Sequence, residues 1–120
     1  MQIPTFLLRK LYVKGSLENV DGGFKFKLKN TISTATAVNF NPLKVNGNEY
    51  SLDSTMISSE DGEIAGSAIS EENTFPIKVG LEITVHVKGN QLAAGEHTID
   101  IALATTEVGD LAFDIIDSIE

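Results

Sequence analysis

Alternation of apolar and charged residues is the feature that most narrows what this chain can fold into. Residues 23–29 read GFKFKLK, so phenylalanine and leucine side chains fall on one side of an extended chain and lysines on the other. The same two-residue period recurs in residues 81–88, 98–105 and 111–116. Successive side chains of a β-strand point to opposite faces, whereas no stretch here has convincing helical periodicity. The pattern therefore predicts strands with one buried face.

Two dipeptides predict tight β-hairpins. Asn46–Gly47 lies between short apolar segments within residues 43–50, and this pair supplies the positive φ angles of a type I′ turn. Asp61–Gly62 occupies the same place within residues 55–66. Each of the two segments is therefore expected to form a pair of antiparallel strands.

The remaining sequence completes an all-β pattern. Further strands are expected at residues 11–15 and 34–40, and residues 67–76 read as a connection with one helical turn after Ser70. About nine short strands with frequent turn signals are typical of an antiparallel β-sandwich, of jelly-roll or immunoglobulin-like type. With 120 residues, the chain is expected to form a single domain, residues 1–120.

Charge and composition exclude several classes of protein. Residues 1–30 hold six basic and two acidic side chains, a net charge of +4, whereas residues 31–120 hold three basic and fifteen acidic ones, a net charge of −12. An acidic surface argues against nucleic-acid binding. The chain has no cysteine for disulfides or thiolate metal sites, and its apolar runs, such as FLL, are too short for a membrane span or a signal peptide. A cytoplasmic protein without membrane contact is the expectation.

Lys25, Lys27 and Lys29 form a basic row on the outer side of the predicted strand at residues 23–29. One interpretation is a solvated face whose lysines also discourage pairing between strand edges. The other is a docking surface for an acidic patch, on a second copy of the chain or on a partner protein. The sequence leaves both open.

The C-terminal strand has apolar residues on both sides. Leu111, Phe113 and Ile115 set the inward phase, and Ile116 and Ile119 are assigned outside it. The strand before it carries small apolar residues, Ala102 and Ala104, on its outer side. Apolar residues on both faces of a sheet indicate that the second face is covered. A homo-oligomer, or a larger enzyme subunit as partner, is therefore expected, with Ile116 and Ile119 as contact residues.

Candidate catalytic and metal-binding residues are few. His86 and His97 are the only histidines, and Glu82 shares a predicted strand face with His86, so these side chains could contribute to a metal site. The favoured interpretation of His97 is structural, with its ring bonded to nearby backbone at the corner before a long strand. The chain has no nucleophile elbow, glycine-rich phosphate loop or dinucleotide fingerprint. No catalytic site and no cofactor are therefore expected.

Aromatic residues suggest one alternative. Phe40, Tyr50 and Phe75 could line a cleft for a small ligand or a carbohydrate. A small metalloenzyme that uses His86 and His97 is a further, weaker alternative.

Three segments carry a family resemblance. They are SLENVDGGFKFKLKN at 16–30, LKVNGNEY at 43–50 and GLEITVHVKGNQLAAGEHTIDIAL at 80–103. In these segments the chain resembles the small β subunit of C-glycoside deglycosidases and short microbial relatives of that subunit. The resemblance implies a β-sandwich that packs on a metal-dependent, barrel-type α subunit holding the catalytic machinery. A hydroxymethylglutaryl-CoA reductase is not expected, because that enzyme needs a nucleotide site and several hundred residues.

Pattern and resemblance together predict a non-catalytic accessory or assembly subunit. It would act through protein–protein contacts, and the resemblance suggests a barrel-type sugar-processing enzyme as its partner. The predicted interaction residues are Lys25, Lys27, Lys29, Ile116 and Ile119.

Overall fold

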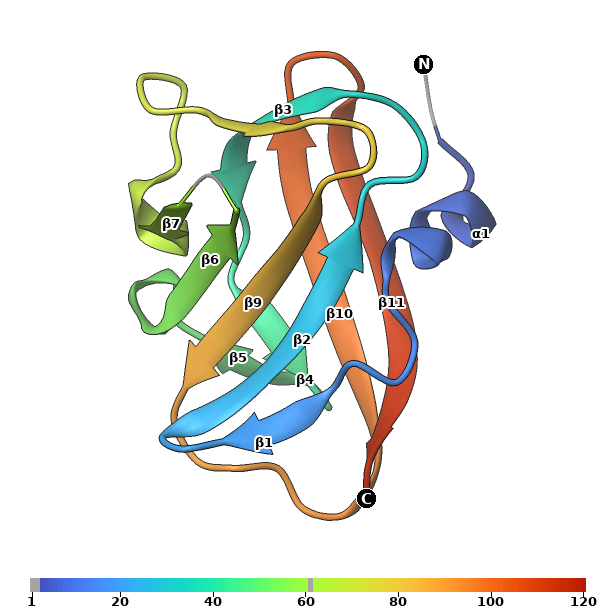
Figure 1. Ribbon diagram of the computed structural model, residues 1–120, viewed down its shortest axis with the longest axis vertical. Helices are drawn as coiled ribbons and strands as arrows, with labels where there is room; N and C mark the ends of the chain where they lie inside the picture. The colour runs from blue at the N-terminus through green and yellow to red at the C-terminus, as the bar shows by residue number, and fades with distance from the viewer. Residues whose placement is uncertain (1–2, 61) are drawn as a thin grey trace.

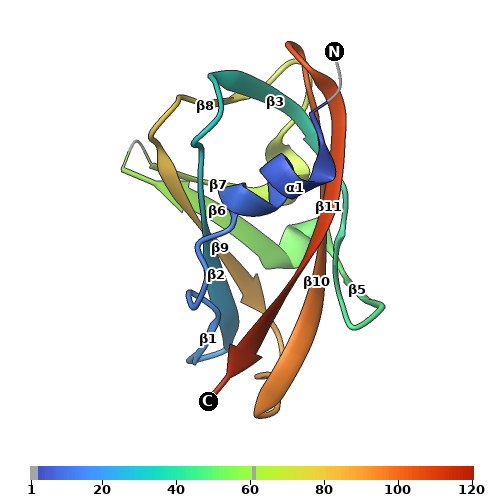
Figure 2. The ribbon, with the colours of Figure 1, turned by 90° about the vertical axis from the view of Figure 1, so that its right-hand side faces the viewer.

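The computed structural model describes residues 3–60 and 62–120. Within them, eleven β-strands form two antiparallel sheets that pack face to face, with short helical segments at the periphery (Figures 1 and 2). The predicted all-β antiparallel sandwich is thus confirmed. None of the helices in the described part of the chain is long and apolar enough to cross a membrane.

The strands divide between the sheets as follows. The first sheet contains, in spatial order, β1 (Glu18–Val20), β2 (Gly23–Lys29), β9 (Glu82–Lys88), β6 (Thr55–Ser59) and β7 (Gly62–Ala65). The second contains β5 (Asn48–Tyr50), β4 (Leu43–Val45), β10 (Gly95–Thr105), β3 (Ala35–Phe40), β8 (Phe75–Ile77) and β11 (Gly109–Ile119), which pairs with β10. The helical segments are α1 (Thr5–Leu8) and the 3₁₀ turns η1 (Arg9–Leu11), η2 (Leu52–Ser54) and η3 (Gly66–Ala68).

Both predicted hairpins are present. β4 and β5 pair around Asn46 and Gly47, whose φ angles of 54° and 83° are those required by a type I′ turn. β6 and β7 pair with Ser59 opposite Gly62, so Gly62 is the first residue of β7 and not a turn residue as predicted. Asp61, the other residue of that predicted turn, lies outside the described residues.

Two local predictions are wrong. Residues 11–15 do not form a strand, because Arg9–Leu11 is a 3₁₀ turn, only Tyr12 bridges to β2, and Gly15 has a φ of 84°. No helical turn follows Ser70, which instead forms an isolated bridge with Asn73. The chain then enters β8, an additional short strand that contains Pro76. Pro76 is tolerated there because β8 lies at the edge of its sheet.

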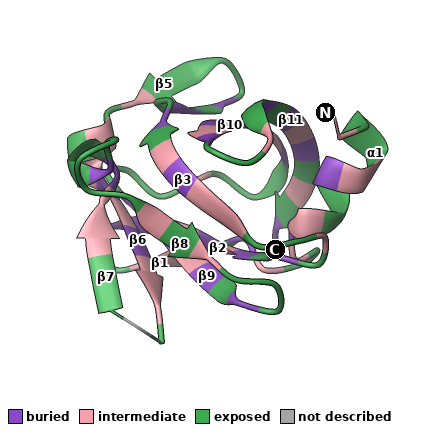
Figure 3. Ribbon diagram, turned by 90° about the horizontal axis from the view of Figure 1, so that it is seen from above, coloured by how far each residue is buried: buried purple, intermediate pink, exposed green. Residues whose placement is uncertain are grey.

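The core lies between the two sheets and is formed by the inward phase of the strands. Buried and exposed residues alternate along the strands (Figure 3), and Phe24 and Phe26 of β2 are completely buried. Ile119 is also buried, so its predicted place on the outer face is wrong. It belongs to the same phase as Ile115. Asp117, a charged residue at the inward position between them, hides that phase in the sequence.

Gly23 marks a close approach between two strands of the first sheet. A Cβ atom at this position would lie 1.9 Å from the carbonyl oxygen of Val87 in β9. The register places Gly23 between Val20 of β1 and Lys88 of β9. Only glycine therefore fits where β2 enters the sheet.

Residues 5–17 cover the open side of the sandwich between β2 and β11, and we call them the N-terminal strap. α1 lies beside β11 in all three views (Figures 1–3). Leu8, Tyr12 and Leu17 of the strap are buried, and the Tyr12 ring packs 5.7 Å from that of Phe26. The strap is therefore part of the core as well as a cover.

Candidate functional site

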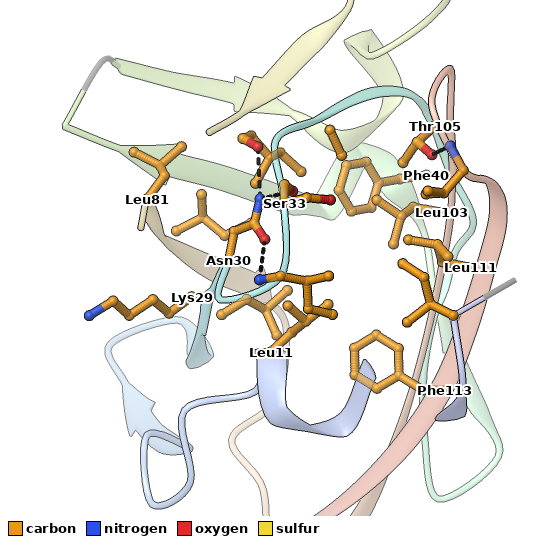
Figure 4. A pocket seen from close by; sticks show the side chains of 17 residues that line it. Leu11, Lys29, Asn30, Ser33, Phe40, Leu81, Leu103, Thr105, Leu111 and Phe113 are labelled. Atoms are coloured by element: carbon orange, nitrogen blue, oxygen red, sulfur yellow. Dashed lines mark hydrogen bonds between the residues drawn. The ribbon is translucent and has the colours of Figure 1, made fainter. Parts of the chain in front are cut away.

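An apolar cavity lies at one end of the sandwich (Figure 4). Its walls come from both sheets and include Phe40, Leu103 and Phe113. Asn30, which is buried, holds the loops at its edge together. The Asn30 amide donates to the carbonyl oxygens of Ser33 at 2.8 Å and Ile77 at 2.9 Å. The Asn30 side chain at the cavity therefore stabilises the surrounding loops.

The cavity is small for a ligand site. Its volume is about 60 Å³, whereas ligand pockets usually measure roughly 300–1,000 Å³. An engineered apolar cavity that accepts benzene measures roughly 150 Å³. The space therefore corresponds to incomplete packing at the end of the core.

Filling this cavity is expected to stabilise the protein. Ala35 lines it from β3, and the change Ala35→Val adds two methyl groups with good strand propensity. We expect the free energy of unfolding to rise by about 1 kcal/mol in urea denaturation. Ala65→Val, in β7 and outside the cavity, makes the same chemical change and is the control. An equal gain in both variants would assign the effect to strand propensity alone.

Asp117 fastens the N-terminal strap to β11. Its Oδ2 atom accepts hydrogen bonds from the Tyr12 hydroxyl at 2.7 Å and from the backbone N–H groups of Gly15 at 3.0 Å and Leu17 at 3.3 Å. Oδ1 accepts from the N–H of Ser118 at 2.8 Å. Burial alone would raise the pKa of Asp117, but these bonds outweigh it and hold the pKa below its ordinary value. Burial of the ring, assisted by the bond to Asp117, raises the pKa of Tyr12.

A second fastening joins the strap to the middle of β11. The Arg9 guanidinium donates through Nη2 to Oδ1 of Asp114 at 2.7 Å and through Nε to the Asp114 carbonyl oxygen at 2.9 Å. The hydrogen bond from Arg9 lowers the pKa of Asp114. This fork shows how a guanidinium neutralises a carboxylate on this side of the molecule.

The outward side chains of β10 and β11 form a surface of small, apolar and acidic residues, which we call the hairpin face. Its members are Glu96, Thr98, Asp100, Ala102, Ala104, Asp110, Ala112, Asp114, Ile116 and Ser118. Residues 95–119 contain no lysine or arginine. Ile116 is 61% exposed, one of the most exposed large apolar side chains of the described chain. This surface is therefore both unusually acidic and incompletely covered.

Backbone register brings pairs of side chains on the hairpin face close together. The carbonyl oxygens of Thr98 and Ala102 accept hydrogen bonds from the N–H groups of Asn46 and Asn41, on the side away from β11. The even-numbered residues of β10 therefore form the non-hydrogen-bonded pairs with the residues opposite them in β11. In such pairs the Cα atoms are only about 4.5 Å apart. Asp100 and Asp114 form one of these pairs, and Ala102 and Ala112 form another.

A hollow of about 580 Å³ lies on the hairpin face. Ala102 and Ala112 line it, and their small side chains leave the space open. Asp100 and Asp114 lie next to them, and Lys44 and Glu49 contribute from β4 and β5. Its volume falls within the range of ligand pockets. The hollow is therefore large enough to receive a side chain from a partner protein.

The three predicted lysines face outward from β2, since Phe24, Phe26 and Leu28 are buried. Lys25 forms an ion pair with Glu18 at 3.1 Å, and Lys27 forms one with Glu82 at 3.7 Å. Lys29 is exposed at the end of the strand. β1 pairs with residues 23–25 of β2, and beyond them the strap covers this edge, where Val13 donates its N–H to the Lys27 carbonyl oxygen and Tyr12 bridges to Leu28. Two of the three lysines thus have a carboxylate partner within the sheet.

The two histidines are not brought together. His86 lies on the outer side of β9, with its Nε2 atom buried and without a hydrogen-bond partner among the described residues. The His97 ring is buried in the other sheet, where Nε2 donates to the Ala93 carbonyl oxygen at 2.7 Å and Nδ1 accepts from the Asn46 amide at 2.8 Å. The predicted bond from His97 to nearby backbone is therefore present. Both of its ring nitrogens are occupied.

The predicted ligand aromatics lie apart. Phe40 is buried at the apolar cavity, Tyr50 packs edge-on against Phe24 at 5.4 Å, and Phe75 lies in the edge strand β8. They do not line a common cleft in the described structure. No group of three or more His, Asp or Glu side chains that could hold a metal ion occurs among residues 3–60 and 62–120.

Comparison with models of known protein families shows to which family the chain belongs. The model of the hydroxymethylglutaryl-CoA reductase N-terminal domain matches residues 7–120. The chain belongs to this family. A search of curated proteins finds no match.

The resemblance to the β subunit of C-glycoside deglycosidases is therefore wrong as a family assignment. The segments that suggested it form β1 and β2, the β4–β5 hairpin, β9 and most of β10. Alternating strands and an Asn–Gly turn occur in many unrelated sandwiches, so they specify a fold rather than a family. The expectation that the chain is unrelated to hydroxymethylglutaryl-CoA reductase is wrong as well, because the matching family model describes the N-terminal domain of that enzyme.

Sequence reasoning missed Asp117, Arg9 and the Asp100–Asp114 pair. Asp117 carried one signal, since it is a charged residue at an inward position of an otherwise apolar strand phase. The pairing of Asp100 with Asp114 follows from the register of β10 and β11, which the turn TEVGD alone does not fix.

Proposed function

We propose that this chain is a non-catalytic accessory module that docks on a larger protein, the catalytic part of a hydroxymethylglutaryl-CoA reductase, through the hairpin face. The observation that carries the proposal is the composition of that face. Exposed Ile116 and the small residues Ala102, Ala104 and Ala112 lie among carboxylates on a regular, long two-stranded surface. Apolar residues exposed in one patch with a polar rim are typical of protein-binding surfaces.

The ionisable groups with shifted pKa values support a structural rather than a chemical role. Tyr12 and Asp117 hold the strap, and Asp114 is bonded to Arg9. Glu107, whose pKa is lowered mainly by its bond from the Thr36 backbone, ties the β10–β11 turn to β3. Each of these groups is engaged in joining elements of the fold. The description of the family as a reductase N-terminal domain supports a catalytic partner of that kind.

A partner of different composition is favoured over a second copy. A two-fold dimer places the same surface on both sides of its interface. Two hairpin faces would then bring Asp100, Asp110 and Asp114 of one copy near those of the other. Repulsion between like charges opposes this arrangement.

The proposal predicts that Ile116 contributes strongly to binding of the reductase catalytic domain. The change Ile116→Asp is expected to weaken the complex at least about tenfold, as for a central contact residue worth more than about 1.4 kcal/mol. Isothermal titration of the purified catalytic domain from the same organism would measure this. Val79→Asp is the matched control, because Val79 is 58% exposed and lies outside the hairpin face.

Two results would contradict the proposal. One is the absence of a complex at micromolar concentrations of both proteins. The other is an equal loss of affinity in the Ile116→Asp and Val79→Asp variants. A dimer of the isolated chain that dissociates on Ile116→Asp, seen by sedimentation, would replace the catalytic partner by a second copy.

A further inference from the structure

We infer that the partner inserts an arginine side chain into the hollow of the hairpin face, where its guanidinium pairs with Asp100. This inference rests on the proposed docking function and specifies the chemistry of the partner at that surface. Four features of the structure carry it: the paired carboxylates, the existing bond from Arg9, the shape of the hollow and its charge.

Asp100 is a carboxylate placed where it needs a cation. It lies directly opposite Asp114 in a non-hydrogen-bonded pair, the closest arrangement of side chains on adjacent strands. Like charges in this position destabilise a sheet. Asp114 is neutralised by Arg9, whereas no hydrogen bond or ion pair reaches the Asp100 carboxylate from the residues that the structure describes. Asp100 is therefore the half of the pair without a bonded counter-ion, although Lys44 lies opposite it on β4.

The bond between Arg9 and Asp114 indicates which cation would fit Asp100. Arg9 comes from a separate element, the strap, and reaches Asp114 with two donors, at 2.7 Å and 2.9 Å. The planar guanidinium presents several donors in a fixed fork, which an ammonium group cannot reproduce. A second arginine approaching Asp100 from outside would repeat the arrangement.

The hollow has the shape that an arginine side chain requires. Ala102 and Ala112 line its surface next to the carboxylates, so the methylene stem of an incoming arginine can lie on their methyl groups. The volume of about 580 Å³ leaves room for the whole side chain and part of its backbone. Bulkier residues at these two positions would close the space.

The charge of the hollow favours a cation over an anion. Three carboxylates, Glu49, Asp100 and Asp114, face two basic side chains, Lys44 and Arg9. Lys44 is the register neighbour of both Glu49 and Asp100, and no ion pair joins it to either in the described part of the chain. Lys44 weakens the negative electrostatic potential at the hollow but does not make it positive. A phosphate or a carboxylate ligand would meet net repulsion.

A binding experiment with a minimal probe tests the inference. The probe is N-acetyl-arginine amide, added to the uniformly ¹⁵N-labelled full chain and followed by backbone amide chemical shifts. We expect saturable shifts at Ala102, Ala112 and Asp114, with a dissociation constant in the millimolar range that increases with salt. N-acetyl-citrulline amide has nearly the same shape without the charge and is expected to cause no such shifts.

Three variants complete the test. Asp100→Asn is expected to raise the dissociation constant about tenfold through loss of a charge-assisted bond. Ala112→Leu, which keeps every charge but fills the hollow, is expected to abolish the shifts. Glu63→Gln removes an exposed carboxylate on β7 of the other sheet and is expected to leave binding unchanged.

The inference is overturned if citrulline amide shifts the same residues equally, or if Asp100→Asn binds arginine amide as the unaltered chain does. Shifts confined to other parts of the molecule would overturn it as well. The proposed docking function has its own test in the Ile116→Asp titration. Failure of the arginine probe with an intact, Ile116-dependent complex would therefore reject the arginine and retain the docking face.

Discussion

Replacement of Gly23 by alanine is expected to lower the free energy of unfolding by about 3 kcal/mol or more, the upper range for overpacking. The added Cβ would lie 1.9 Å from the Val87 carbonyl oxygen and 3.0 Å from its carbonyl carbon. Backbone atoms cannot rotate away as a side chain can. β9 would have to move, and Val87 and Phe24, both completely buried, would move with it. Urea denaturation of the purified variant would measure the loss.

Gly22 provides the control for this prediction. It precedes Gly23 and has a φ of 81°, and a Cβ added to it would have no described neighbour within 4 Å. Gly22→Ala therefore costs only the strain of a left-handed backbone, about 1 kcal/mol. Similar losses in the two variants would show that backbone conformation, rather than the contact with Val87, determines the effect.

Asp117→Ala is expected to lower the free energy of unfolding by about 3 kcal/mol, because three hydrogen-bond donors of the strap lose their acceptor. These donors are the Tyr12 hydroxyl and the N–H groups of Gly15 and Leu17. Water can reach part of this region and limits the loss. Asp117→Asn keeps an amide oxygen in place and is expected to lose about half as much. Hydrogen exchange of the strap amides would show whether the strap detaches.

Asp110→Ala is the matched control, since Asp110 is an exposed aspartate near the start of the same strand. It is expected to change stability by no more than about 0.5 kcal/mol. An Asp117→Ala variant as stable as Asp110→Ala would contradict the assignment of Asp117 as the fastening of the strap.

The same fastening gives stability a dependence on pH. The pKa of Asp117 is lower in the folded protein than its ordinary value of 3.8, so folding favours the ionised carboxylate. Its stabilising contribution is complete above that ordinary value and is lost as the pH falls through the lower, folded pKa. Urea midpoints measured from about pH 6 to pH 2 should therefore fall less steeply for Asp117→Asn than for the unaltered chain. A residual slope remains, because the pKa of Asp114 is lowered too.

Local alternation was sufficient to predict the fold class and much of the core. The period of residues 23–29 correctly separates the buried Phe24 and Phe26 from the lysines, and Asn46–Gly47 correctly predicts a hairpin. These features depend on neighbours in the sequence, which a single chain displays. Residues 11–15 show where local alternation fails. They alternate as a strand would, yet the bridge from Tyr12 to Leu28 and the Asp117 bonds hold them as a strap.

The candidate site depended on information that the sequence does not display. The outward direction of the lysines was predicted, but their partners Glu18 and Glu82 come from different strands and depend on register. Ile119 was misplaced because Asp117 interrupts the apolar phase of β11. The role of that aspartate becomes visible only when residues far apart in the chain meet.

The fastening of the strap has a consequence for the order in which the molecule forms. Tyr12 and Asp117 are separated by 105 positions along the chain, and so are Arg9 and Asp114. Closing so large a loop is entropically costly, whereas β10 and β11 are joined by a short turn and can pair early. During synthesis the strap emerges before β11 and finds its partners only after β11 has been made. A segment synthesised early is thus among the last to reach its final place.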